Sequence, residues 1–252
     1  MPAATAGALA AALLGLAPLT HAAPVDWRDV ESRIQYGFYT EDARALENVA
    51  AGLVADEEPG GLHDYYTALA AWRLAQLRRT QRGTPGTAEL AQKCVRALDA
   101  FLAAQSDSAS GLALRAACAV TPLVGGAAAP FALHRPRRDV QRALQLAAHD
   151  PRVLLIDASL DQDLTSVQGG NRERALGTLR RAVSAFEAER EGPEPVPGWG
   201  AAEAYLYLAR NLLEHADALG ARDALEHALL LAPQYAQARR LLAQLTAQDN
   251  SP

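Results

Sequence analysis

Lysine and aromatic residues are scarce in this chain of 252 residues. Lys93 is the only lysine, and aromatic residues make up 6% of the chain. The formal net charge is −5, and no basic stripe is interleaved with aromatic residues, which disfavours binding to nucleic acid. Val, Ile and Thr are too sparse to favour a sheet protein, whereas half of the residues are hydrophobic and most of these are Ala and Leu. Because Ala and Leu are strong helix formers, the composition predicts an all-α protein.

Motifs that would carry catalysis or bind a cofactor are also missing. The sequence has no HExxH motif, no Cys/His spacing typical of zinc ligands and no GxSxG motif. Paired glycines at 60–61, 125–126 and 169–170 have neither a preceding strand nor a following Lys-Ser/Thr, so they indicate turns rather than phosphate-binding loops. We therefore predict no catalytic residue, no metal and no cofactor, and a protein that is not an enzyme.

Three neighbouring carboxylates keep one enzymatic alternative open. Asp157, Asp161 and Asp163 lie close together in the sequence, and the first two share a helical face. Paired carboxylates can hold a cation or act as acid and base. The segment has no glycine-centred calcium loop, however, so a solvated helix face is the simpler interpretation. An enzyme built on a helical superhelix and using these aspartates remains the alternative.

The N-terminal segment predicts export. Residues 3–19 form an uncharged run of mostly Ala and Leu, and the small residues Thr20, Ala22 and Ala23 follow. This pattern is typical of a secretory signal peptide, here residues 1–23, with cleavage after Ala22 or Ala23. The segment lacks the usual basic residues, and an uncleaved anchor is the alternative, although the run barely reaches the ~20 residues that a spanning helix needs. We expect a periplasmic or secreted protein without a stable membrane span after cleavage.

Pro, Gly and short polar clusters divide the rest of the chain into helices. Asp26 is expected to cap the first helix, and Thr40 is expected to open the second. The longest irregular stretch runs from Thr121 to Pro136, and such loops are often functional. The predicted helices cover residues 27–35, 41–55, 62–79, 88–104, 112–120, 137–148, 152–167, 171–189, 201–215, 220–231 and 234–247.

The last pair of helices before Pro233 has a distinctive distribution of residue sizes. Large residues on the first helix face small residues on both helices, an arrangement that lets two helices pack closely. Pro233 cannot sit inside a helix without cost, so it marks the end of the unit. The large residues are Tyr205, Leu208 and Leu212, and the small ones are Ala209, Ala221 and Ala228.

This unit resembles a tetratricopeptide repeat, whose ~34-residue helix pair has large and small residues at these offsets and ends in proline. Weaker matches precede it, for example at Ala175, Leu179 and Ala182. The segments "DPRVLLIDASLDQDLTSVQGG" and "PGWGAAEAYLYLA" resemble exported bacterial tetratricopeptide proteins without an assigned activity. The resemblance implies a right-handed superhelix of antiparallel helix pairs, an α-solenoid. It is expected to comprise N-terminal helices (24–61), degenerate repeats (62–233), and a capping helix with a tail (234–252).

The resemblance also implies a binding surface. In tetratricopeptide proteins the first helix of each pair lines a concave groove, and residues of that helix that are not used for packing face the partner. The implied function is a scaffold that binds an unidentified protein or peptide, with a small-ligand or cell-wall carrier as the alternative. The residues expected to face the groove are Glu203, Leu206, Tyr207, Arg210 and Glu214.

Cys94 and Cys118 are the only cysteines. An even number of cysteines in an exported protein is compatible with a disulfide. The two lie on consecutive predicted helices at similar distances from the intervening turn, but helix axes are usually 8–10 Å apart whereas bridged Cα atoms need roughly 4.4–6.8 Å. Alanines around Cys118 would allow the close approach. A disulfide and two buried free thiols both remain open.

Overall fold

The computed structural model describes residues 25–53, 61–80, 85–126, 130–190 and 197–249. The predicted signal peptide, residues 1–23, lies outside these ranges. Every regular element in them is helical, which confirms the all-α prediction, and none of these helices is long and apolar enough to cross a bilayer. The α-helices are α1 (Trp27–Tyr39), α2 (Ala43–Gly52), α3 (Leu62–Thr80), α4 (Thr87–Ala104), α5 (Ala109–Val120), α6 (His134–Leu146), α7 (Pro151–Asp163), α8 (Arg172–Arg190), α9 (Ala201–Glu214), α10 (Ala218–Leu231) and α11 (Ala236–Asp249), and the 3-10 helices are η1 (Thr121–Leu123), η2 (Pro130–Leu133) and η3 (Ser166–Gln168).

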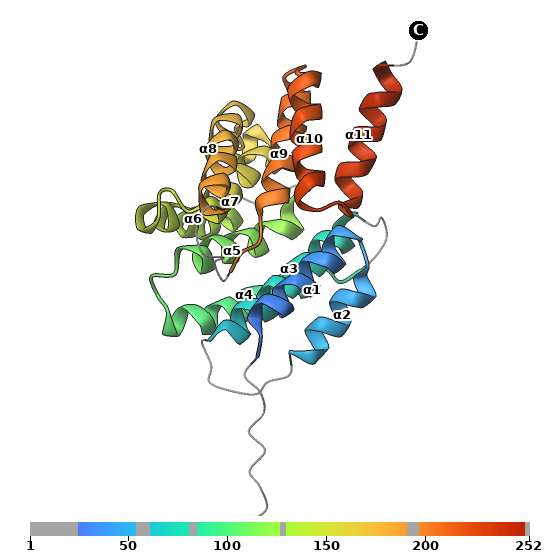
Figure 1. Ribbon diagram of the computed structural model, residues 1–252. Coiled ribbons are helices and arrows are strands. Elements are labelled where there is room, and N and C mark those ends of the chain that lie inside the picture. The colour runs from blue at the N-terminus through green and yellow to red at the C-terminus, as the bar shows by residue number, and fades with distance from the viewer. Residues whose placement is uncertain (1–24, 54–60, 81–84, 127–129, 191–196, 250–252) are drawn as a thin grey trace, which may run out of the picture.

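Consecutive helices pack as pairs, and the pairs stack in chain order to form an α-solenoid (Figure 1). The pairs are α1/α2, α3/α4, α5/α6, α7/α8 and α9/α10, and α11 packs on α10. This architecture confirms the predicted fold class. Helices α1 and α2, which we expected to precede the repeats, form a further pair that packs against α3.

The packing of α9 against α10 follows the size pattern in the sequence. The three alanines of the predicted interface, Ala209, Ala221 and Ala228, are 0% exposed. Tyr205 and Leu212 are also buried. Leu208, the third large residue of the pattern, is only half-buried. Small side chains therefore set the close approach of this pair.

Several predicted helix ends need correction. The second helix begins at Ala43 because Asp42 caps it: its carboxylate accepts a hydrogen bond from the backbone N–H of Ala45, at 2.9 Å. Thr40 instead follows the last turn of α1. Helix α7 stops at Asp163 rather than at 167, and η3 follows it. The stretch from Thr121 to Pro136 is not wholly irregular, since it contains η1, η2 and the start of α6.

The two ends of the solenoid touch each other. On α1, Phe38 and Tyr39 pack against Tyr235, which immediately precedes α11, with ring centroids 6.1 and 4.5 Å apart. Beside them the guanidinium of Arg240 on α11 donates to the carboxylate of Glu41, with Nη1–Oε2 at 2.8 Å. Figure 1 shows the first and last helices meeting on the right side of the molecule. The inner face is therefore partly closed by the chain's own N-terminal pair.

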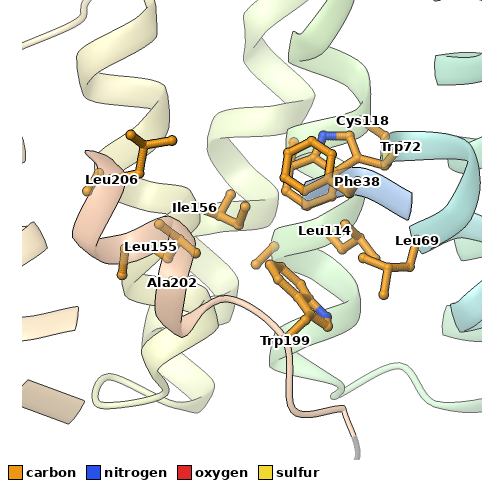
Figure 2. Close-up of a cluster of buried hydrophobic side chains, with 14 of the residues drawn as sticks. Phe38, Leu69, Trp72, Leu114, Cys118, Leu155, Ile156, Trp199, Ala202 and Leu206 are labelled. Atoms are coloured by element: carbon orange, nitrogen blue, oxygen red, sulfur yellow. The ribbon is translucent and has the colours of Figure 1, made fainter. Parts of the chain in front are cut away.

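The segment that leads into α9 also enters the core. Trp199 is 2% exposed, its indole N–H donates to the hydroxyl of Tyr65 at 3.0 Å, and its ring meets that of Trp72 edge-on at 5.5 Å. Figure 2 shows Trp199 projecting from this segment into the hydrophobic cluster. The next residue, Gly200, has φ +118°, and a Cβ there would lie 2.7 Å from the ring of Phe186, so only glycine fits.

Cys94 on α4 and Cys118 on α5 form a disulfide, with Cα atoms 6.0 Å apart and both residues 0% exposed. Of the two possibilities that the sequence left open, the structure has the bridge. Two alanines beside it, Ala116 and Ala117, are buried as well. The bridge joins two consecutive helix pairs near the middle of the solenoid.

Candidate functional site

A cleft opens on the inner side of the solenoid, between helices that are distant in the sequence. Its water-accessible volume is about 60 Å³. Since one water needs roughly 10–15 Å³ of such volume, the cleft has room for a few waters or the end of one side chain. Its lining residues come from α1, α3, α7, α9 and the start of α11: Phe38, Trp72, Arg73, Gln76, Arg79, Thr80, Leu155, Ile156, Ser159, Glu203, Tyr207, Arg210, Tyr235 and Gln237.

The floor of the cleft is a buried ion pair between Arg73 on α3 and Glu203 on α9, which are 1% and 2% exposed. Two further donors reach the same carboxylate: the side-chain amide of Gln35 at 2.8 Å and the hydroxyl of Tyr39 at 2.7 Å. Burial and the neighbouring Glu203 charge raise the pKa of Tyr39 well above its usual value, so its hydroxyl stays a donor. The carboxylate of Glu203 is therefore satisfied from within the protein.

The guanidinium of Arg73 is equally well held. It donates to the side-chain oxygens of Gln35 at 3.1 Å and Gln76 at 3.0 Å. Its Cζ lies 4.2 Å from the ring centroid of Phe38 and 4.5 Å from that of Trp72, within range of cation–π attraction. Each of the three guanidinium nitrogens thus donates to a side chain of the protein, and a buried charge surrounded in this way fixes the arrangement of α1, α3 and α9.

The mouth of the cleft differs from its floor, because its two arginines are accessible to solvent. Arg79 is exposed, and Arg210 is half-buried and donates to the amide oxygen of Gln237 at 2.8 Å. Tyr207 lies next to Arg210, and its hydroxyl donates to the carboxylate of Asp163 at 3.0 Å. Two guanidinium groups, a phenol ring and a carboxylate thus converge at the entrance, a combination suited to polar recognition.

The carboxyl of Asp163 lies beside this entrance, against the hydroxyl of Tyr207. Burial raises its pKa above the ordinary value, although the positive charges of Arg79 and Arg210 and the hydrogen bond from Tyr207 act in the opposite direction. The folded protein therefore binds a proton here more readily than the unfolded chain does. The resulting stability is fully present below the unfolded pKa, about 3.9, and is lost as pH rises through the folded pKa.

Asp163→Asn should remove this loss. We expect the free energy of unfolding of the variant, relative to wild type, to increase as pH rises from about 4 to 7, because only the wild type must ionise a buried carboxyl. The measurement is urea denaturation across that pH range, with Asp29→Asn as the control for losing a negative charge at an exposed site. Stability curves of Asp163→Asn and wild type that run parallel with pH would contradict the assignment.

The structure separates the five residues that were predicted to face a partner. Tyr207 and Arg210 line the mouth of the cleft, and Glu203 lies at its floor. Glu203 and Leu206 do not face an open groove, since they are 2% and 1% exposed. This corrects the placement of both: Glu203 pairs with Arg73, and Leu206 packs in the core cluster. Glu214 is exposed outside the cleft and pairs with Arg172 on α8, at 2.5 Å.

The three aspartates of the enzymatic alternative do not act as one cluster. Asp161 is buried and paired with Arg174, whose Nε lies 2.5 Å from its carboxylate. Asp163 lies near the cleft and accepts a hydrogen bond from Tyr207. Burial and the charge of Asp161 raise the pKa of Asp157. Within the described part of the chain, no group of three or more His, Cys, Asp or Glu residues is arranged to hold a metal ion.

Sequence reasoning missed Arg73, Arg79 and the buried role of Glu203. In the sequence, Arg73 looks like any charged residue of an alanine-rich helix. A signal was present in its neighbourhood: α3 combines Trp72, Tyr65 and Tyr66, an unusual share of the few aromatic residues of this chain. Such a helix is expected to be buried on more than one face, and charges on it then need partners.

Similarity to known proteins is found in the fold of this chain and not in its sequence. No protein-family model matches the sequence, and no curated protein matches it significantly. A crystal structure of TTC0263, a thermophilic tetratricopeptide protein of Thermus thermophilus, aligns over 88% of this chain and 97% of its own, with a TM-score of 0.54 and 14% identity. The chain therefore has a tetratricopeptide-like fold. The assembly chaperone of RpL4, Acl4 (residues 1–338), aligns over 89% of this chain and 96% of its own, with a TM-score of 0.44 and 14% identity, and we conclude nothing from it.

Proposed function

We propose that this protein is an exported scaffold that binds a segment of a partner protein at the mouth of the cleft. The observation that carries the proposal is the convergence of Arg79, Arg210 and Tyr207 at an entrance with an enclosed space behind it. Arg and Tyr are the residue types that most often dominate protein interfaces. A helical-repeat fold similar to a tetratricopeptide protein supports a binding rather than a catalytic role.

The shape of the cleft favours a limited contact with the partner. The water-accessible space of about 60 Å³ accommodates part of one side chain, so the partner's main chain would lie across the entrance and not run through the solenoid. The floor, closed by Phe38 and the Arg73–Glu203 pair, would set the depth that the side chain can reach. The small volume gives no support to the alternative of a small-ligand or cell-wall carrier.

The binding role can be tested by placing a photo-crosslinking amino acid at Gln76 or Gln237 and, as the control, at exposed Arg44. A partner captured from the cleft positions alone should then lose affinity for Arg79→Gln/Arg210→Gln by about tenfold or more, because hydrogen bonds to charged groups are worth about 1.5–3 kcal/mol each. The matched variant Arg33→Gln/Arg44→Gln removes the same charge from α1 and α2. Unchanged affinity of a folded cleft variant, or capture only at position 44, would refute the cleft as the site.

Export is proposed from the N-terminal sequence, and the buried Cys94–Cys118 disulfide supports it, since such bridges persist in oxidising compartments. A reporter that is active only outside the cytoplasm, fused after residue 24, should be active. N-terminal sequencing of the mature protein should begin at Ala23 or Pro24. Soluble protein that retains Met1 would contradict the proposal.

A further inference from the structure

A second groove lies between α5 and α6, and it shares no lining residue with the cleft. It is open, with a water-accessible volume of about 440 Å³. Helix α6 is the outer helix of its pair at the left edge of Figure 1, away from the meeting point of α1 and α11. The groove is lined by four arginines, two glutamines, one aspartate and one leucine: Arg115, Arg135, Arg138, Arg142, Gln141, Gln145, Asp139 and Leu112.

The single carboxylate among these lining residues is already neutralised. Arg115 on α5 donates to both oxygens of Asp139, from Nε at 2.9 Å and from Nη2 at 2.8 Å. The third nitrogen of Arg115 donates to Asp99 on α4 at 2.9 Å. Both members of the Arg115–Asp139 pair are nearly buried, with side chains 14% and 11% exposed. This pair therefore forms a fixed wall of the groove and contributes little net charge.

The remaining arginines form a stripe along α6. Arg135, Arg138 and Arg142 are spaced by three and four residues, so they lie on one face of the helix, and Gln145 continues the same stripe. Arg135 pairs with Asp99 at 2.6 Å and Arg142 with Asp107 at 3.2 Å. Both arginine side chains are 53% exposed, and exposed ion pairs are worth little, so a ligand can displace these carboxylates.

The local charge contrasts with that of the whole protein. Four arginines and one aspartate give α6 a formal charge of +3, in a chain whose formal net charge is −5. Asp99 and Asp107 offset part of this charge in the free protein, and an anionic ligand that replaces these exposed carboxylates would offset it in their place. Charge complementarity thus indicates that the partner surface is negative.

We propose that the α5/α6 groove is a docking site for an extended acidic segment of a partner protein. Glutamate or aspartate side chains would pair with Arg135, Arg138 and Arg142, and the amides of Gln141 and Gln145 would bind the peptide backbone. Among the described residues that line the groove, none is aromatic, so none offers a ring on which a base could stack, which disfavours single-stranded nucleic acid. Its one apolar lining residue, Leu112, is 7% exposed and cannot insert into a lipid surface.

The direct test is fluorescence anisotropy with a labelled oligoglutamate peptide and its oligoglutamine counterpart. The full-length mature protein should bind oligoglutamate in preference to oligoglutamine, more tightly at low salt. Arg138→Gln/Arg142→Gln should weaken binding by about tenfold or more. The control Arg33→Gln/Arg44→Gln has the same net charge and should bind as the wild type does.

A third variant tests the exchange of partners directly. Asp107→Asn removes the carboxylate that competes for Arg142, so it should strengthen oligoglutamate binding. Because the side chain of Asp107 is 72% exposed, the substitution should not affect folding.

Equal binding of oligoglutamate by Arg138→Gln/Arg142→Gln and by its control would overturn the proposal. So would tighter binding to a single-stranded oligothymidylate, or to phosphatidylserine vesicles, which Phe131, 82% exposed just before α6, could favour. The cleft variant Arg79→Gln/Arg210→Gln should retain oligoglutamate binding, so the two sites fail or succeed separately.

Discussion

Replacing Glu203 with glutamine is expected to lower the free energy of unfolding by about 3–5 kcal/mol, the range observed when one partner of a buried ion pair is removed. The variant leaves the Arg73 guanidinium, 1% exposed, without its counter-charge. It also weakens the acceptor for the Gln35 amide and the Tyr39 hydroxyl. Urea denaturation followed by circular dichroism at neutral pH measures the effect.

Two further variants separate the ion pair from simple damage to the fold. Arg73→Met/Glu203→Leu should recover part of the lost stability, because it leaves no unpaired buried charge. The recovery is incomplete because the Gln35 amide and the Tyr39 hydroxyl lose their acceptor. The matched control is Glu47→Gln, at an ion pair with Arg78 whose side chains are 50% and 30% exposed, and it should change stability by about 0–1 kcal/mol. If Glu203→Gln lowered the free energy of unfolding no more than Glu47→Gln does, the Arg73–Glu203 pair would not be what holds the floor of the cleft together.

Removing the disulfide is the second change with a large expected effect. Cys94→Ala/Cys118→Ala should lower the free energy of unfolding by about 3–4 kcal/mol, since the bridge closes a loop of 24 residues and restricts the unfolded chain. Both positions are 0% exposed, so the lost sulfurs add a smaller packing cost. Thermal and urea denaturation of the variant and the oxidised wild type give the comparison.

Wild-type protein that has been reduced and held in reductant is the control for this experiment. It should lose a similar amount of stability, because it lacks the same cross-link but keeps both sulfur atoms. Free-thiol titration of the denatured, unreduced wild type should detect no thiol from Cys94 or Cys118. Two reactive thiols in that assay would contradict the bridge, whatever the stability of the variant.

The sequence by itself determined which segments are helical and how the best pair packs. Local signals suffice for this: the capping aspartate Asp26, the Ala/Leu periodicity, and the alternation of large Tyr205 with small Ala221 and Ala228. One error arose where two local signals compete within a few residues. Thr40 and Asp42 are both good caps, and the helix starts at the second because the turn through Glu41, with φ +57°, separates it from α1.

Only the tertiary structure decided what the inner face looks like. Glu203 and Leu206 occupy the positions where an open solenoid would expose them, but Arg73 on α3 and the hydrophobic cluster cover them. The contacts responsible join residues that are far apart, such as Gln35 with Glu203 across 168 positions and Glu41 with Arg240 across 199. No local pattern encodes such pairs, because each depends on the small rotations between successive helix pairs, summed over the whole solenoid. Together these rotations bring the end of α1 next to the start of α11. The structure therefore has a small cleft with an arginine-lined mouth where an open groove was expected.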